Sequence, residues 1–291
     1  MLPTADTQAR ANSLIQEIDD WRRRAPGHIH NFGLDKLDYL QQTRAPHIEY
    51  GEGALFLLVP RHDFHDIIFF VETIEHLPCA LSALVHKLGT EKKYRITLNY
   101  KQSDPESEND LVRAVFQAGF VRRQRITRIR FNLAPGASEE RSQQLLSLTA
   151  GIPFAAEFAV PGDEEEILAL LREEFDPCAD NLPELDEIRQ NIENRQVVII
   201  RHQEEIIAAN YFTIKNAVYY SVYNITRKDF RGKSLFRKIE LFIDDWFRKN
   251  NFHLTRSHGW RDITKKHFQH GDAQRGTVWE NIFIDYLIWK Q

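Results

Sequence analysis

The chain has 291 residues, a length that favours two domains over one. Hydrophobic residues make up 42% and charged residues 27%, which is the composition of a globular protein that buries a core. The formal net charge is -4, so the chain lacks the overall basic field of many nucleic-acid-binding proteins, and any anion site must be local.

Few residues suggest a metal, a disulfide or a membrane segment. Cys79 and Cys178 lie far apart in sequence, and the two His-x-x-His pairs that begin at His62 and His267 lack a third ligand at typical spacing. Residues 1–16 contain no apolar signal-peptide core, and no apolar run reaches the roughly 18–20 residues that span a bilayer. We therefore expect a cytoplasmic protein with no metal, no membrane partner and no nucleic-acid partner.

The spacing of apolar residues separates predicted helices from predicted strands in the first half. The expected elements are, in chain order, helices at 6–24 and 34–42, strands at 54–59 and 66–71, a helix at 78–88, a strand at 94–100, a helix at 111–117 and a strand at 126–133. Proline, glycine, serine and charged residues then cluster at 134–144, which predicts a linker at 136–152.

The second half shows the same kinds of pattern after this linker. The expected elements are a strand at 155–160, helices at 164–175 and 183–194, strands at 197–201, 206–214 and 217–225, a helix at 232–250, a strand at 252–257, a short helix at 263–270 and a closing strand pair that ends at Trp289. Asn216 supplies a turn between two of these strands, which predicts an antiparallel meander.

Both halves end with the same order of elements and with similar short sequences. Residues 116–119 read FQAG and residues 268–271 read FQHG, each between a short helix and a closing strand. The repeated order predicts a duplicated α+β unit, with one domain at 1–135 and a second at 153–291.

A basic turn at 227–238 is the most informative segment. It reads RKDFRGKSLFRK, with six basic residues and one acidic residue, between a predicted strand and a predicted helix. Cations at a helix N-terminus oppose the helix dipole, and a bound anion would relieve this conflict. Gly232 lets the backbone approach a phosphate, and the N–H groups of the first helical turn are donors for it. The sequence therefore predicts a phosphate-binding turn.

Within this turn, Arg231-Gly232-Lys233-Ser234-Leu235-Phe236 resembles the pyrophosphate loop of the GNAT superfamily of N-acyltransferases. The family pattern is Arg or Gln, two variable residues, Gly, one variable residue, then Gly or Ala, so Ser234 and Phe236 depart from it. Because Phe236 stands beside the apolar stripe of the following helix, we expect its ring to point into the core. The order of elements over 154–291 also resembles this family.

The resemblance implies an α+β fold with two GNAT-like domains, each a mixed, mainly antiparallel sheet flanked by helices. The turn at 72–76 in the first half has no glycine, and Glu72 and Glu75 would repel a nucleotide by Coulomb repulsion. The domain at 1–135 is therefore expected to be a degenerate GNAT-like domain, and the domain at 153–291 an acyltransferase domain.

The resemblance further implies transfer of an acyl group from acetyl-CoA, or another acyl-CoA, to an amine of a small molecule or peptide. In this family the fourth strand splays away from the fifth, and its N–H groups meet the pantetheine arm and the thioester carbonyl. The residues implied to bind the acyl-CoA are Asn224, Ile225, Thr226, Arg231, Gly232, Lys233, Ser234, Leu235 and Phe236.

Three side chains are candidates for the chemistry. His267 stands four residues before Gly271, roughly where many family members carry a tyrosine that protonates the leaving thiolate, and Tyr223 is the alternative acid. Glu174 lies near the end of a predicted helix where acceptors commonly bind in this family, so it could attract a cationic amine or accept its proton.

Two other readings stay open. A GNAT-fold protein that has lost turnover would bind or sense a ligand, which Phe236 and the absence of an obvious base in the fourth strand suggest. A Fem-like transferase that takes aminoacyl groups from tRNA is compatible with the duplication, although the acidic net charge disfavours a large RNA partner. The sequence is compatible with a monomer or a homodimer.

Overall fold

The computed structural model describes residues 5–25, 27, 29–31, 46–104, 107–132, 137–180, 182–252, 256–264 and 277–289. Contacts divide the chain into two compact units, unit 1 with residues 1–126, 262–266 and 281–291, and unit 2 with residues 127–261 and 267–280. Each unit is a mixed, mainly antiparallel sheet flanked by helices, so the predicted α+β class is confirmed.

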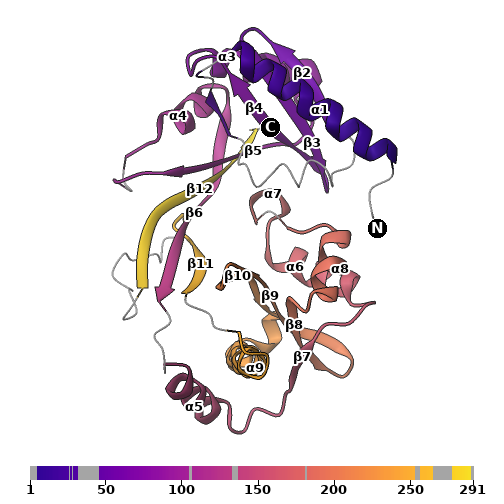
Figure 1. Ribbon diagram of the computed structural model, residues 1–291, viewed down its shortest axis with the longest axis vertical. Helices are drawn as coiled ribbons and strands as arrows, with labels where there is room; N and C mark the ends of the chain where they lie inside the picture. The colour runs from indigo at the N-terminus through magenta and orange to yellow at the C-terminus, as the bar shows by residue number, and fades with distance from the viewer. Residues whose placement is uncertain are drawn as a thin grey trace. The chain divides into compact units, whose positions relative to one another are not determined.

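The sheet of unit 1 combines strands from both ends of the chain (Figure 1). Its order is β2 (His47–Gly51), β3 (Ala54–Arg61), β4 (Phe64–Val71), β5 (Tyr94–Lys101), β12 (Thr277–Trp289) and β6 (Phe120–Asn132). β2, β3 and β4 are antiparallel neighbours, β4 is parallel to β5, and β12 is antiparallel to β5 with Ile282 opposite Lys101. β6 and β12 each contribute residues to both units.

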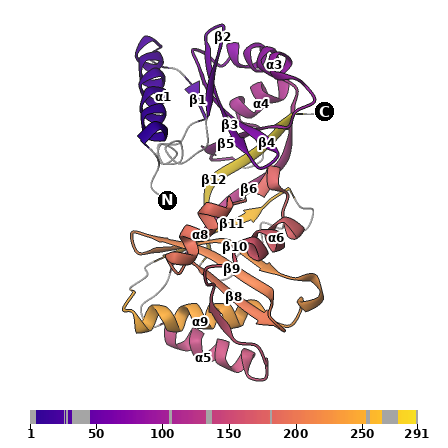
Figure 2. The same cartoon turned by 90° about the vertical axis from the view of Figure 1, so that its right-hand side faces the viewer.

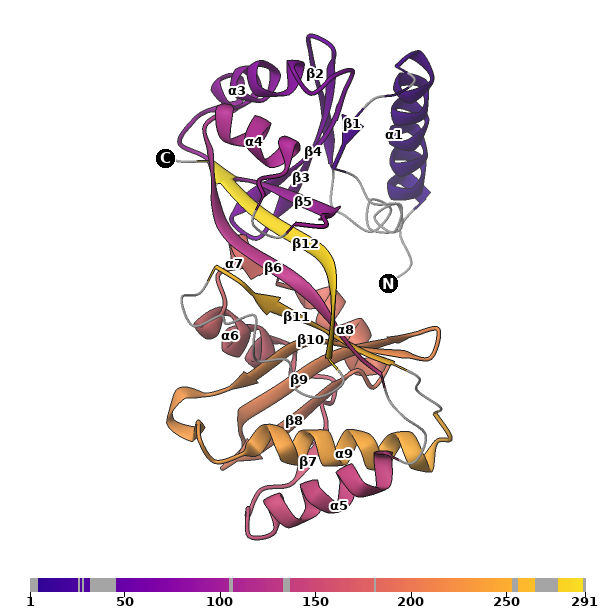
Figure 3. The same cartoon turned by 90° about the vertical axis from the view of Figure 1, so that its left-hand side faces the viewer.

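Helices cover both faces of this sheet (Figure 3). α3 (His76–Leu88) and α4 (Asp110–Gln117) pack on one face, and α1 (Ala5–Arg24) packs on the other through Ile18 and Trp21. Neighbouring residues of one strand serve opposite cores, because successive side chains of a strand point to opposite faces: Phe69 faces α3, and Phe70 faces Trp21.

The C-terminal strand is tied into unit 1 by a buried carboxylate. Asp285 of β12 is fully buried, and its Oδ2 accepts a hydrogen bond from the Tyr100 hydroxyl at 2.6 Å. Its Oδ1 accepts another from Nε of Arg122 at 2.9 Å. Burial of a carboxylate is costly unless such donors surround it, so β12 fits this place in the sheet specifically.

The edge of β4 that faces β5 is hydrogen-bonded in turn to β5, to the Asn31 side chain and to β1. β4 and β5 pair only at His65 with Tyr94 and at Asp66 with Arg95, and the Asp66 carboxylate binds Arg95 at 2.5 Å and 2.7 Å. Beyond this point the Asn31 amide bridges the two strands. Its Nδ2 donates to the carbonyls of Ile67 at 3.0 Å and Thr97 at 3.3 Å, and its Oδ1 accepts from the N–H of Phe69 at 2.8 Å.

The short strand β1 (Ile29–His30) continues this closure, since it pairs antiparallel with Phe70 and Val71 of β4. A segment from the N-terminal part of the chain thus lies where β4 would otherwise present a bare edge.

The sheet of unit 2 contains the predicted meander. β7 (Ala156–Phe158), β8 (Val197–His202), β9 (Glu205–Lys215) and β10 (Val218–Thr226) are antiparallel neighbours, and β10 is parallel to β11 (Arg256–Asp262), which lies next to β6. Asn216 and Ala217 join β9 to β10 with φ of 52° and 59°, the positive values that a tight hairpin turn requires.

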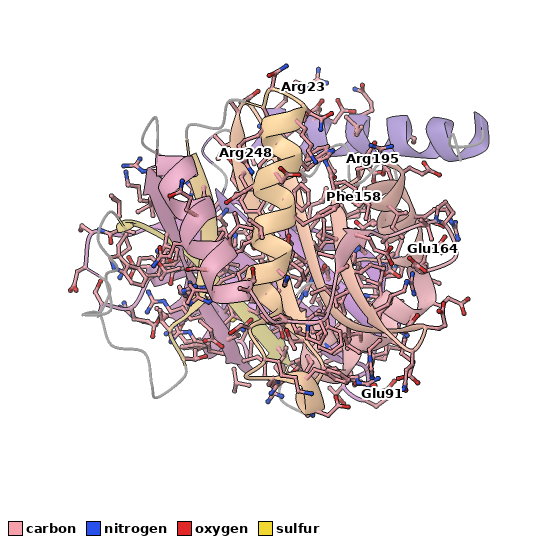
Figure 4. All side chains as sticks on the ribbon, turned by 90° about the horizontal axis from the view of Figure 1, so that it is seen from below. Arg23, Glu91, Phe158, Glu164, Arg195 and Arg248 are labelled. Carbon is pink, nitrogen blue, oxygen red and sulfur yellow. The ribbon has the colours of Figure 1, made fainter. Side chains whose placement is uncertain are left out.

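Two helical layers enclose this sheet (Figure 2). α6 (Glu164–Glu174), α7 (Pro177–Asp180) and α8 (Leu185–Glu193) lie towards one face, with Ile167, Leu171 and Ile188 in the core beneath α6 and α8. α9 (Leu235–Lys249) covers the other face, and α5 (Ala137–Thr149) packs on α9. Phe158 of β7 meets the α9 side (Figure 4), with its ring 5.0 Å from that of Phe242.

Several elements differ from the sequence predictions. α5 occupies most of the predicted linker, because packing against α9 stabilises a helix whose first half is polar. β2 was not predicted, and residues 281–291 belong to unit 1 rather than to the second half. The predicted closing strand pair is the single strand β12. The predicted helix at 34–42, residues 265–270 of the short helix and the FQHG sequence lie outside the described residues.

Replacing Asn31 by Ala should destabilise unit 1. The substitution removes the amide that joins β4 to β5 and leaves backbone groups without their partner, so we expect a loss of about 1–3 kcal/mol of unfolding free energy. Urea unfolding measures this loss. Asn99→Ala on exposed β5 surface is the matched control, expected within about 0.5 kcal/mol of wild type. Equal stability of both variants would contradict the bridging role.

Candidate functional site

Strands β10 and β11 of unit 2 separate after a short contact. Their parallel pairing joins Val218 with Arg256, Tyr219 with Ser257 and Tyr220 with His258. β10 then continues to Thr226, paired only with β9 among the described strands. No described strand pairs with the edge of β10 that faces β11 over the second half of β10.

A β-bulge marks the point where the strands separate. Ser221 lies opposite Phe212 of β9, and Tyr223 lies opposite Tyr211, so Val222 is an extra residue in β10. Before the bulge, Tyr219 packs on Phe247 of α9; after it, Tyr223 packs in the core on the α6 side. A bulge locally disrupts the ladder and re-aims backbone groups, which suits a binding edge.

A buried amide stabilises this irregular backbone. Asn210 of β9 is fully buried, its Nδ2 donates to the carbonyl of Tyr223 at 3.3 Å and to the side chain of Asn224, and its Oδ1 accepts from the Tyr219 hydroxyl at 3.1 Å. Burial raises the pKa of the Tyr219 hydroxyl, which keeps this group protonated as a donor. The exposed Asn224 side chain also donates to Ser221 at 2.8 Å.

The turn between β10 and α9 leads directly away from this edge. After the short 3-10 helix η2 (Lys228–Phe230), the backbone enters the left-handed region at Gly232, with φ of 78°, and again at Ser234, with φ of 57°. The N–H groups of residues 232–236 have no hydrogen-bond acceptor within the described part of the chain. A Cβ built on Gly232 would meet nothing within 4 Å, so the turn is open there.

Phe230 anchors this turn to the core. Its ring is buried among Phe154 and His202, with ring centroids 6.0 Å and 5.4 Å away. Nζ of Lys233 lies 4.3 Å from the centroid of the same ring, a cation–π contact that orients an otherwise exposed lysine.

Arg231 is held by groups at the end of β10 and of α6. Its Nε donates to the carbonyl of Thr226 at 3.3 Å, and its guanidinium forms an ion pair with Glu174. The Arg231 side chain is 52% exposed, while that of Glu174 is 13% exposed. Arg227, by contrast, is occupied by Asp229 and Glu205, so it is less suited to a ligand than Arg231 or Lys233.

The structure brings most of the predicted acyl-CoA-binding residues into one region of unit 2. Asn224, Ile225 and Thr226 form the end of β10, and the next residues of the set form the turn. The side chains of Ile225 and Leu235 are buried in cores, so only their backbone could meet a ligand. Phe236 is half-buried, and the expected direction of its ring stays a prediction.

The three predicted catalytic side chains lie in different environments. Tyr223 is buried, and its hydroxyl donates to the carbonyl of Asp180 at 2.8 Å, which gives this group a structural role. Glu174 is the ion-pair partner of Arg231. His267 lies outside the described residues.

Sequence reasoning missed His258, which lies opposite Tyr220 at the last residue pair of β10 and β11. The predicted strand ended at residue 257, one residue before it, whereas β11 extends to Asp262. Strand register depends on tertiary pairing, so the sequence alone does not predict which residue lies opposite Tyr220. The local indication of His258 was its position in His258-Gly259-Trp260, directly after the predicted end of the strand.

Within the described ranges, no group of three or more His, Cys, Asp or Glu side chains is arranged to hold a metal ion. No helix in the same ranges is long and apolar enough to cross a membrane.

Comparisons with known proteins identify the fold. No protein-family profile and no curated protein sequence matches the chain. Among solved structures, a tandem GNAT protein from the clavulanic acid biosynthesis pathway is 10% identical, with a TM-score of 0.52 over 95% of this chain and 94% of that chain. The chain has the GNAT fold. A GCN5-related N-acetyltransferase from Sphaerobacter thermophilus is also similar, with 12% identity and a TM-score of 0.47 over 81% of this chain and 76% of that chain.

Units 1 and 2 differ at the corresponding strand edge of the GNAT fold. In unit 1 the edge beyond the short parallel pairing is covered by β1 and Asn31, and the last pair is an ion pair of Asp66 and Arg95. In unit 2 the last pair is Tyr220 and His258, and no described strand covers the edge beyond it. The two edges thus have the same topology but different partners among the described strands.

Replacing Ser234 by Gly should stabilise the protein. Ser234 adopts a left-handed backbone conformation that costs a non-glycine residue about 1 kcal/mol, and the family pattern has glycine at this position. We expect a gain of about 0.5–1 kcal/mol, measured by thermal or urea unfolding. Ser147→Gly, inside helix α5, is the control and should destabilise by about 0.5 kcal/mol or more. A loss of stability in Ser234→Gly would contradict this backbone interpretation.

Proposed function

We propose that unit 2 is an acyl-CoA-dependent N-acyltransferase that transfers an acyl group, with acetyl-CoA as the expected donor, to a primary amine of a small molecule or peptide. One observation carries the proposal. Beyond Tyr220, the edge of β10 that no described strand pairs with runs directly into a turn whose N–H groups have no acceptor among the described residues, while the equivalent edge of unit 1 is covered by β1 and Asn31.

The turn suits a diphosphate. Backbone N–H groups at residues 232–236 converge at the start of α9, where the helix dipole also favours an anion. Lys233 and Arg231 both belong to this turn and are both exposed, with 52% of the Arg231 side chain exposed. A diphosphate would compete with Glu174 for the Arg231 guanidinium, which can bind phosphate oxygens through two N–H groups.

The edge of β10 suits the pantetheine arm. This arm is an extended chain with two amide groups, and amide chains bind to open strand edges through backbone hydrogen bonds. Residues 221–226 supply such an edge, and the bulge at Val222 lies at its inner end, towards the point of strand separation. A thioester carbonyl at this point would meet backbone donors, which stabilise the oxyanion that forms when the amine attacks.

The acceptor side is expected to lie towards α6 and α7. Glu173 is exposed at the end of α6, Asp176 precedes α7 and Asp180 is its last residue, and both aspartates are half-buried and accept hydrogen bonds from backbone N–H groups of this segment. A carboxylate-rich surface favours a cationic amine over an anionic acceptor.

Titration with acetyl-CoA or coenzyme A tests the proposal by isothermal calorimetry. We expect one site per chain, because among the described strands the edge of β4 in unit 1 is paired with β1, whereas the second half of β10 in unit 2 has no partner on this edge. Arg231→Ala and Lys233→Ala should each weaken binding about 10- to 100-fold, the range for losing a charge-assisted hydrogen bond to phosphate. Lys249→Ala is the control, because it removes the same charge at the opposite end of α9, and it should leave the affinity unchanged.

Absence of binding at millimolar ligand by a folded sample would reject the proposal. Binding without thiol release in the presence of any amine would instead favour the inactive, ligand-binding alternative. Binding of aminoacyl-tRNA but not of coenzyme A would favour the Fem-like alternative.

A further inference from the structure

His258 lies at the apex between β10 and β11, which is the point where these two parallel strands separate. It is opposite Tyr220 in the last parallel pair, and beyond this pair β10 carries the bulge at Val222 and pairs only with β9 among the described strands. The reacting thioester of the proposed function would lie beside this apex. His258 is buried, with 7% of the residue exposed.

The face of the sheet that carries His258 follows from its neighbours. Tyr219 packs on Phe212 and Phe247, on the α9 side. The next residue of a strand points to the opposite face, so Tyr220 points towards the α6 side. The ring of His258 meets that of Tyr220 edge-on, with centroids 5.1 Å apart, and therefore lies on this same face. This is the side on which an amine would approach.

Two other candidate side chains in the described residues have a hydrogen-bond or ion-pair partner in unit 2. The Tyr223 hydroxyl donates to the Asp180 carbonyl, and Glu174 binds Arg231. Tyr220 lies opposite His258, but a tyrosine hydroxyl is a weaker proton acceptor than an imidazole nitrogen.

We propose that His258 is the proton-transfer residue of the acyl transfer, a role that rests on the proposed function of unit 2. The amine lone pair forms the new N–C bond to the thioester carbonyl. One ring nitrogen of His258 accepts the N–H proton of the resulting intermediate. The C–S bond then breaks, its electron pair leaves with sulfur, and the imidazolium returns the proton to that sulfur as coenzyme A thiol. The amine becomes the amide, and no oxidant or metal is needed.

The first test observes the imidazole without any acceptor. In protein labelled with 15N-histidine, the 12 histidines give ring signals, and the spectrum of His258→Phe assigns the one of interest. Titration with the non-hydrolysable thioether analogue S-acetonyl-coenzyme A should shift the His258 signals, because the sulfur lies beside the ring. The signals of His86, an exposed residue of unit 1, should not move.

The second test measures turnover. Thiol release from acetyl-CoA is followed with a panel of primary amines, including a polyamine, an amino sugar and a lysine peptide. His258→Phe keeps an aromatic ring against Tyr220 and should keep the analogue affinity within about threefold, while kcat falls about 100- to 10,000-fold. His258→Ala should regain part of its kcat with added imidazole, and the control His86→Phe should retain wild-type kcat.

The outcomes separate the two proposals. If the analogue binds but the His258 signals do not shift, or if His258→Phe turns over within threefold of wild type, the assignment of His258 is overturned while acyl-CoA binding stands. If no analogue binds to folded protein, the proposed function itself fails, and the assignment fails with it. If no amine in the panel is turned over, the assignment of His258 is tested by the shift of its ring signals on analogue binding alone.

Discussion

The short parallel pairing of β10 and β11 determines what unit 2 can do. Only three residue pairs join the strands before the bulge at Val222, and the buried amide of Asn210 holds the backbone on the far side of that bulge. A longer ladder would satisfy the backbone of β10 internally and leave no edge for a ligand. The same separation brings His258 to the inner end of the edge and the turn at residues 231–236 to its outer end, so the proposed proton transfer and the proposed diphosphate binding both depend on it.

Unit 1 shows how the same topology can lose such an edge. The Asp66–Arg95 ion pair, the Asn31 amide and β1 together occupy the positions that no described strand pairs with in unit 2. Each of these groups forms hydrogen bonds or an ion pair with groups of β4 or β5 that would otherwise face water or a ligand. The covering of this edge therefore also contributes to the stability of unit 1. The carboxylates of Glu72 and Glu75 after β4 act in the same direction, because they disfavour an anion at the neighbouring turn.

The sequence was sufficient for features that depend on local chemistry. Apolar periodicity located β3, β4, α6 and α9, and the run of basic residues around Gly232 located the turn. Features that depend on pairing between distant segments were not accessible. The ion pair of Arg231 with Glu174, the register of Tyr220 with His258 and the insertion of Asn31 each join residues separated by 36 or more positions along the chain. The helix α5 was missed because its contact with α9, rather than its own composition, stabilises it.

The pairing of β12 with β5 has a consequence for biosynthesis. Residues 282–288 lie against residues 95–101, and the buried Asp285 needs Tyr100 and Arg122 as donors. During vectorial synthesis the first unit therefore stays incomplete until the final strand emerges from the ribosome, although most of its chain is made early. Cutting the chain between its halves would leave β5 with an exposed edge prone to self-association, so the two halves are poor candidates for separate expression.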